Sequence, residues 1–271
     1  MKSIKLLGLL CLICFTFFYT EKIITVSINQ DEIMIKLKEI EESYKIEPID
    51  AIIKDNTIIP GNTGKTINLE LSYKEMKKIG YFEESLIKYE TIYPTISIYN
   101  NYDKYIIKGN PYQKNISLIY IINNDKTIND ILNIIKQRNT TISFFIDSTF
   151  LNNNIDIISK LKDNEIYNYG NNGSYTKDNL IISNNIINNK SNNISNYCLF
   201  LNKDNKSIDN CQESKMLSII PSIQGNYNDI KNNLQPGSII LIKNTQELSS
   251  IIDYIKNKGY NIMPLSKVIT E

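Results

Sequence analysis

The sequence predicts an α/β protein whose parallel sheet is preceded by a small α+β region and an N-terminal membrane helix. Three observations predict it: strand and helix patterns alternate over residues 113–271, short apolar stretches broken by turns fill residues 25–112, and an apolar run occupies residues 6–19 near the N-terminus. Strands alternating with helices of this length are typical of βαβ units. Alternation alone leaves a compact barrel and a doubly wound sheet both open.

Residues 1–24 have the pattern of a secretory signal. Lys2 and Lys5 precede an apolar run over residues 6–19, as in a positive segment followed by a hydrophobic one. No small-residue cleavage site follows, so an uncleaved signal anchor is favoured over a cleaved signal peptide. A spanning helix needs about 20 residues; the run over residues 6–19 is shorter, and Ile4, Ile23 and Ile24 can extend it. We expect a membrane-anchored, extracytoplasmic protein, or a secreted one if the signal is cleaved.

Residues 25–112 are expected to form a small α+β region. Apolar residues recur at helical spacing from Asp31 to Tyr44. A second helix is expected from Ser72, at the N-cap, to Gly80, which closes it. Pro111 marks the expected boundary with the next region.

Residues 113–271 show the alternation most clearly. We expect strands at 116–122, 141–146, 165–169, 197–201, 216–220, 238–242 and 261–264. We expect helices between them at 127–137, 154–162, 177–188, 207–215, 227–233 and 247–258.

Composition excludes several classes of chemistry. The chain has no histidine, so Ser-His-Asp and Cys-His catalysis are excluded and the commonest nitrogen ligand for metals is missing. Lys+Arg number 30 against 29 Asp+Glu, a net charge of +1, which gives no basic surplus for a phosphate backbone. We therefore expect no nucleic-acid partner.

The segment Gly61 to Thr66 has some likeness to a phosphate-binding loop. Two residues separate its glycines, whereas a P-loop has four and leads from a strand into a helix. Pro-Gly and Asn-Gly clusters are typical of hairpin turns. We therefore expect a turn, with no nucleotide and no other cofactor.

Cysteines and carboxylates offer two further candidate sites. Cys198 and Cys211 lie 13 residues apart on the expected outer side, and a disulfide and two free buried thiols both remain open, because spacing does not supply geometry. Five carboxylates have oxygens of the kind that hold a cation, but none has a recognisable ligand spacing, so no metal site is expected; they are Asp125, Asp130, Asp147, Asp156 and Glu165.

Three stretches resemble the NodB-homology family, the polysaccharide deacetylases. Residues 140–146 (TTISFFI) resemble the family's second barrel strand, residues 164–169 (NEIYNY) its histidine-containing strand, and residues 235–245 (QPGSIILIKNT) the strand with a late catalytic histidine. The likeness covers about residues 115–270. It implies a distorted (β/α) barrel, and a reaction that removes N-acetyl groups from sugars with a metal-bound water, an aspartate base and an Asp-His-His metal triad.

The positions that the resemblance assigns to catalysis carry other residues. The base, the three metal ligands, the late histidine and its neighbouring aspartate correspond to Ile121, Ile122, Tyr169, Gly173, Lys243 and Asn244. A metal-bound water needs several ligands to hold the cation and lower the water's pKa to around 7. The resemblance therefore implies a degenerate member without catalytic or metal-binding residues.

The sequence thus predicts an inactive deacetylase-like protein whose strand-end cleft binds cell-wall polysaccharide or peptidoglycan. The tyrosines expected to line this cleft are Tyr120, Tyr167, Tyr169 and Tyr175. Two alternatives remain open. One is a deacetylase with a relocated site that uses Asp125, Asp147 or Glu165, and the other is a structural envelope protein that acts through its N-terminal region.

Overall fold

The computed structural model describes residues 2–203 and 205–271, with side chains for all of these except residues 2–13, 17, 21, 205 and 206. The chain divides into two compact units. The N-terminal unit comprises the residues up to 48 together with 63–92, and the C-terminal unit comprises residues 49–62 and 93–271.

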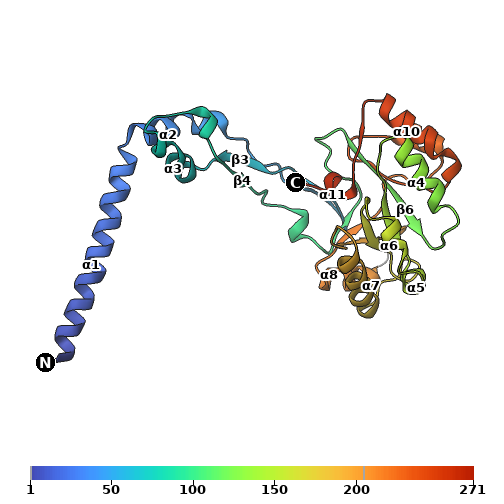
Figure 1. The fold of residues 1–271 in the computed structure, drawn as a ribbon, viewed down its shortest axis with the longest axis horizontal. Helices are drawn as coiled ribbons and strands as arrows, with labels where there is room; N and C mark the ends of the chain where they lie inside the picture. The colour runs from blue at the N-terminus through green and yellow to red at the C-terminus, as the bar shows by residue number, and fades with distance from the viewer. Residues whose placement is uncertain (1, 204) are drawn as a thin grey trace. The chain divides into compact units, whose positions relative to one another are not determined.

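The N-terminal unit combines helices with one antiparallel strand pair (Figure 1). Its elements are α1 (Lys2–Asn29), α2 (Glu32–Tyr44), β3 (Gly64–Ile67), α3 (Leu69–Ile79), the 3-10 helix η1 (Glu84–Leu86) and β4 (Tyr89–Ile92). One apolar face of α2 packs against α3 and β3, and the buried residues there are Ile33, Leu37, Ile67, Met76 and Ile87. This burial holds the short elements together.

None of the helices in the described part of the chain is both long enough and apolar enough to cross a membrane. Most of the residues expected to form the anchor, 4–24, have side chains that the structure does not describe. The membrane anchor therefore stays a prediction.

Helix α3 begins earlier than the sequence predicts. Asn68 is its N-cap residue, and the Asn68 side chain accepts a hydrogen bond from Leu71 N at 2.9 Å. Ser72, the expected cap, lies inside the helix, where its buried hydroxyl accepts from Lys88 N at 2.9 Å. Asn and Ser are both good caps, so the packing of Ser72 against residue 88 decides between them. Gly80 ends the helix as predicted, in the left-handed region with φ 82°.

Two five-stranded sheets form the centre of the C-terminal unit. The first contains β11 (Ile239–Leu241), β6 (Asn115–Ile122), β7 (Ser143–Ile146) and β8 (Ile166–Asn168) in that order, and β12 (Asn261–Ile262) also pairs with β6. The order in the second is β1 (Ile52–Lys54), β2 (Thr57–Ile59), β5 (Tyr105–Ile106), β10 (Leu217–Ile219) and β9 (Tyr197–Leu199). The strands of both sheets pair in parallel apart from the β1–β2 hairpin.

The second sheet corrects the boundary expected between residues 112 and 113. Strand β5 pairs with β10, with Tyr105 opposite Ser218, and β2 pairs with β5. Residues 49–62 and 93–112 therefore complete a sheet of the C-terminal unit. Short apolar strands carry no sequence signal for the distant strand that they pair with, which is why the prediction placed them in the small N-terminal region.

Helices separate the strands of the C-terminal unit, as the alternating pattern predicts. They are α4 (Ile128–Gln137), α5 (Ser148–Asn153), α6 (Ile157–Lys160), α7 (Lys177–Lys190), α8 (Asn205–Glu213), α9 (Tyr227–Asn233), α10 (Leu248–Asn257) and α11 (Leu265–Val268), with 3-10 helices η2 (Ile98–Asn100) and η3 (Thr245–Glu247). In Figure 1, α4 and α10 lie together on one side of this unit and α5, α6 and α7 on another. The single helix expected at 154–162 is replaced by α5 and α6, because Asp147 caps a helix that starts at Ser148.

The described strands form two sheets, where the sequence predicts one barrel. The sheets approach each other at two places: Ile223 forms an isolated parallel bridge with Ile240 of β11, and the N–H of Asn168 in β8 donates to Ser195 Oγ at 3.0 Å. The α/β class is confirmed, since parallel strands alternate with helices. The strand pairings of the described residues leave these two sheets separate and do not close them into a barrel.

Candidate functional site

A pocket lies where strands β6 and β11 of the first sheet end, beside the residue that follows β8. Its cavity volume is about 310 Å³. The carboxyl ends of parallel strands meet at one edge of a sheet, which is where α/β proteins form ligand sites. The residues that line the pocket are Tyr120, Ile121, Asn123, Tyr169, Asn172, Leu201, Leu241, Ile242 and Lys243.

The two isoleucines at the end of β6 lie on different sides of the strand. Ile121 lines the pocket, whereas Ile122 has no exposed surface and belongs to the core cluster that includes Ile131 and Ile252. Successive side chains of a strand alternate between its faces. The interpretation of both as positions of one site is therefore corrected: an aspartate at position 122 would project into the core.

Tyr169 lines the pocket and Gly173 does not. The N–H of Gly173 donates to Tyr169 O at 3.1 Å, and Gly173 has a φ of 82°. A Cβ atom added at Gly173 would lie 3.0 Å from the Tyr169 hydroxyl oxygen. A histidine at this position would be both strained and obstructed, so positions 169 and 173 do not form a ligand pair in this chain.

Lys243 follows β11 and lines the pocket, and its side chain is exposed. The neighbouring Asn244 is not among the lining residues. Its side chain accepts from Gln246 N at 3.0 Å and so caps η3. Of the two positions, only Lys243 belongs to the pocket.

The pocket does not fit the divalent metal that the resemblance implies. Its lining offers aliphatic groups, phenols, amides and one ammonium, with no carboxylate, imidazole or thiolate. Divalent cations in hydrolases are held by several ligands of those missing kinds. Across the described residues, nowhere do three or more Asp, Glu or Cys side chains come together as a metal-binding group.

The acidic side chains considered for a relocated metal site lie apart. One oxygen of Asp147 accepts from two N–H groups in the first turn of α5, and the other accepts from Asn172 N at 2.7 Å. Glu165 precedes β8, at the opposite end of that strand from the pocket, and accepts from Ser143 Oγ at 3.0 Å. Asp125 is exposed in the loop after β6. Asp147 therefore caps α5, Glu165 supports the neighbouring strand, and Asp125 is exposed to solvent.

Of the four tyrosines expected in the cleft, two line the pocket and two lie in the interior. Tyr120 and Tyr169 line it. Tyr167 and Tyr175 are each 1% exposed, and the Tyr175 hydroxyl accepts from Leu199 N at 2.7 Å. Burial raises the pKa of both phenols far above its ordinary value. The prediction is wrong for Tyr167 and Tyr175, because a side chain without exposed surface cannot contact a glycan.

Cys198 of β9 and Cys211 of α8 form a disulfide with their Cα atoms 6.4 Å apart. Both residues are buried. The bridge fastens α8 to the strand that leads to Leu201 in the pocket wall. Of the two arrangements that the spacing leaves open, the structure has the bridged one.

Sequence reasoning did not single out five of the residues that line the pocket. They are Asn123, Asn172, Leu201, Leu241 and Ile242. Asn123 and Asn172 occur in an Asn-rich chain in which asparagine carries little signal, and the three aliphatic residues look like ordinary strand residues. The sequence marks these five residues as candidates for the site only through their positions near the ends of strands.

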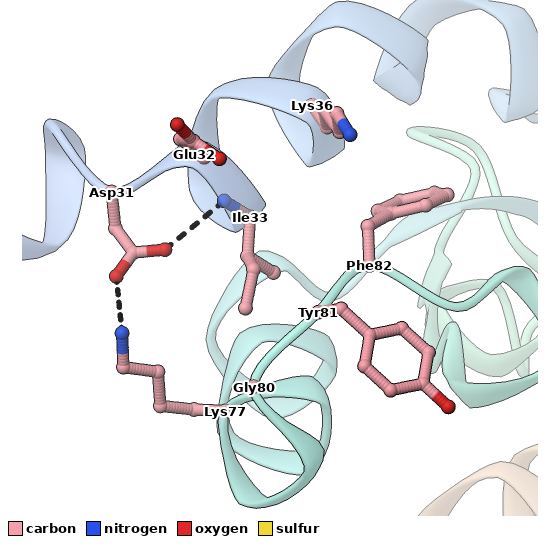
Figure 2. A pocket seen from close by; sticks show the side chains of 8 residues that line it. All are labelled: Asp31, Glu32, Ile33, Lys36, Lys77, Gly80, Tyr81 and Phe82. Carbon is pink, nitrogen blue, oxygen red and sulfur yellow. Dashed lines mark hydrogen bonds and ion pairs between the residues drawn. The ribbon is translucent and has the colours of Figure 1, made fainter.

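A second pocket, of about 280 Å³, lies in the N-terminal unit between the start of α2 and the end of α3 (Figure 2). Asp31 accepts from Ile33 N at 3.0 Å and pairs with the Lys77 ammonium. The Lys77 ammonium and the Ile33 amide hold the pKa of the Asp31 carboxyl below its ordinary value. The two central charges of this pocket thus neutralise each other, and the strand-end pocket is the better candidate for a site.

No protein-family model matches the chain. Solved structures do: BA3943 of Bacillus anthracis, described as a CE4 family pseudoenzyme, aligns with a TM-score of 0.65 at 19% identity over 89% of this chain and 96% of that one. The chain has the fold of the family 4 carbohydrate esterases. The Bc1960 peptidoglycan N-acetylglucosamine deacetylase also aligns with this chain, with a TM-score of 0.55 at 17% identity over 61% of this chain and 92% of that one. The predicted resemblance to polysaccharide deacetylases is confirmed at the level of the fold.

A relative is also found by sequence. YlxY of Bacillus subtilis (strain 168), described as uncharacterized, is 28% identical over 140 residues, which make up 51% of this chain and 44% of YlxY. The similarity therefore spans less than half of that protein's length.

Proposed function

We propose that this protein is a catalytically inactive deacetylase-like protein that binds a cell-envelope glycan in its strand-end pocket. The observation that carries the proposal is that Ile121 and Lys243 both lie in the pocket wall. Deacetylation with a metal-bound water needs a base and several metal ligands there. An aliphatic group can do neither, and an ammonium has no lone pair with which to bind a cation.

Glycan binding is supported by the groups that the pocket presents. The Tyr169 hydroxyl has no hydrogen-bond partner among the described residues, and Asn123 and Asn172 are exposed. Amides and phenols can donate and accept, and the Tyr120 ring adds an apolar face suited to a sugar ring. A cavity of about 310 Å³ is within the range of small-molecule sites. The BA3943 description as a pseudoenzyme and the Bc1960 description as a peptidoglycan deacetylase support the same assignment.

We further propose that residues 4–24 anchor the protein in a membrane, with both units outside the cytoplasm. The lysines before the apolar run favour this orientation. The Cys198–Cys211 disulfide is in line with it, because disulfides persist in oxidising compartments. If the signal is cleaved, the same disulfide fits a secreted protein.

We also propose that the two sheets together form the distorted barrel implied by the resemblance. The Ile223–Ile240 bridge and the Asn168–Ser195 hydrogen bond support this arrangement at the two places where the sheets meet.

Retention of the full chain on purified peptidoglycan and on chitin oligomers tests the proposed binding. We expect Tyr169→Phe combined with Asn172→Ala to weaken retention several-fold, because both changes remove pocket hydrogen-bonding groups. Tyr112→Phe is the matched control, since Tyr112 is exposed and lies outside the pocket. Equal retention of all three proteins, or none of the wild type, would argue for a structural role instead.

A further inference from the structure

The wall of the strand-end pocket carries a single charge, and that charge is positive. Lys243 is the only charged residue among those that line the pocket. Its ammonium forms no ion pair and no hydrogen bond with any residue that the structure describes. The side chain is therefore a free cation at the mouth of a cavity whose other lining groups are neutral.

The neighbouring carboxylate, Asp147, does not line the pocket, and its oxygens are occupied by backbone N–H groups of the chain. Asp147 is close enough for its charge to add to burial in raising the pKa of the Tyr169 phenol. Both Asp147 oxygens, however, accept backbone N–H groups, including Asn172 N at 2.7 Å. In the loop after β6, Asp125 and Lys126 are adjacent charges of opposite sign, and neither lines the pocket.

The pocket also offers more free donors than free acceptors. Asn123 Oδ1 accepts from Asn124 Nδ2 at 2.7 Å, which leaves the Asn123 amide NH₂ free to donate. Tyr169 contributes a hydroxyl without a partner among the described residues, and Lys243 contributes three N–H donors. The Tyr120 hydroxyl is already bonded to Thr127 Oγ1 at 2.8 Å, so Tyr120 contributes its ring.

We propose that the pocket selects a sugar that carries an anionic substituent, a carboxylate or a phosphate, with Lys243 as its counter-charge. This inference rests on the proposed glycan-binding function. An oxyanion can accept from the ammonium, the amide and the phenol together, and hydrogen bonds to charged groups are the stronger kind. A neutral sugar would leave the Lys243 charge without a partner.

Calorimetry with three probes tests the selection on the full-length protein. The probes are N-acetylmuramic acid with a carboxylate, N-acetylglucosamine 6-phosphate with a phosphate, and neutral N-acetylglucosamine. We expect one or both anionic sugars to bind about five- to tenfold more tightly than the neutral one at low ionic strength, and the preference to shrink with added salt. The arm that shows the preference identifies the substituent.

Charge variants assign the preference to its source. We expect Lys243→Gln to abolish the preference for anionic sugars and Lys243→Arg to restore it. Lys190→Gln, at an exposed position in the last turn of α7 and outside the pocket, should change nothing. Equal binding of neutral and anionic sugars, or a preference that survives Lys243→Gln, overturns the inference and leaves glycan binding intact. If none of the three sugars binds, the proposed function fails and this inference fails with it.

Discussion

Ile121 and Ile122 are consecutive residues of β6, yet Ile121 lines the strand-end pocket and Ile122 is fully buried in the core cluster of the C-terminal unit. The two positions therefore have different physical requirements. Ile121 is partly buried at the edge of the cavity. Ile122 is part of the hydrophobic core. Replacing it with aspartate would therefore destabilise the fold.

We expect Ile122→Asp to lower the free energy of unfolding by about 3–5 kcal/mol, because it removes buried apolar volume and buries a carboxyl group without a partner. Ile121→Asp is the matched variant, and we expect it to cost about 1 kcal/mol or less, because its side chain is only partly buried. Urea unfolding of both variants measures the difference. Similar losses for the two would contradict the placement of Ile122 in the core.

Reduction of the Cys198–Cys211 bridge should destabilise the C-terminal unit. In the chain-entropy model a bridge closing a loop of this length contributes about 3 kcal/mol, and these cysteines are 13 residues apart. We expect Cys198→Ser with Cys211→Ser to lower the urea midpoint and to remove its dependence on reducing agent. An unchanged midpoint on reduction of the wild type would mean that the two sulfurs are not bridged in solution.

Much of the C-terminal fold could be predicted from the sequence, because strand and helix each leave a periodic pattern. Strand β6 and helices α9 and α10 lie within one residue of their expected ends. The pairing of β5 with β10 could not be predicted, since a two-residue strand has no periodicity and its partner is more than 100 residues away. The start of α3 was misplaced because Asn68 and Ser72 are both good caps and only tertiary packing separates them.

The interior tyrosines give the protein a defined alkaline limit. Burial raises the pKa of Tyr167, Tyr175 and Tyr197 above the ordinary value of 10.0. The unfolded chain releases these protons near pH 10 and the folded chain does not, so their contribution to stability is complete below pH 10 and falls as the pH rises above it.

Absorbance at 295 nm followed together with circular dichroism checks this expectation. Tyr167, Tyr175 and Tyr197 should ionise only as the secondary structure is lost. Reversible ionisation of all 18 tyrosines near pH 10 in a folded protein would show that Tyr167 and Tyr175 are accessible after all.

The Asp31–Lys77 pair predicts an acid-sensitive contact in the N-terminal unit. The folded-state pKa of Asp31 lies below 3.8, so its stabilising contribution is present above that pH and is lost as the pH falls through the lowered folded-state value. We expect Asp31→Asn to lower the midpoint of thermal unfolding at pH 7, and the gap from wild type to close as the pH falls below about 4. Glu32→Gln, one residue away and exposed, is the control. A gap that is constant with pH would contradict a role for the Asp31 charge.

The position of the candidate site could be predicted from the sequence, but the full set of residues that line it could not. The family resemblance of residues 235–245 predicts a site position at Lys243, and that of the NEIYNY stretch predicts one at Tyr169. Both residues line the pocket. The same motif-matching placed Ile122, Gly173 and Asn244 at the site, because a motif gives order along the chain and not the direction of a side chain. Tyr167 is two residues from Tyr169, on the same face and in the same core cluster. It lies deeper, 1% exposed against 5% for Tyr169, and only Tyr169 lines the pocket.

Acetate release by the full-length protein, measured together with its metal content, tests the central claim most directly. The substrates are peptidoglycan and chitin oligomers, zinc, manganese or cobalt is supplied in turn, and the Bc1960 deacetylase is the positive control. The absence of carboxylate and imidazole from the pocket predicts no acetate above background and metal far below one equivalent. Stoichiometric metal with acetate release that continues over many turnovers would contradict the assignment of this protein as an inactive member of the fold.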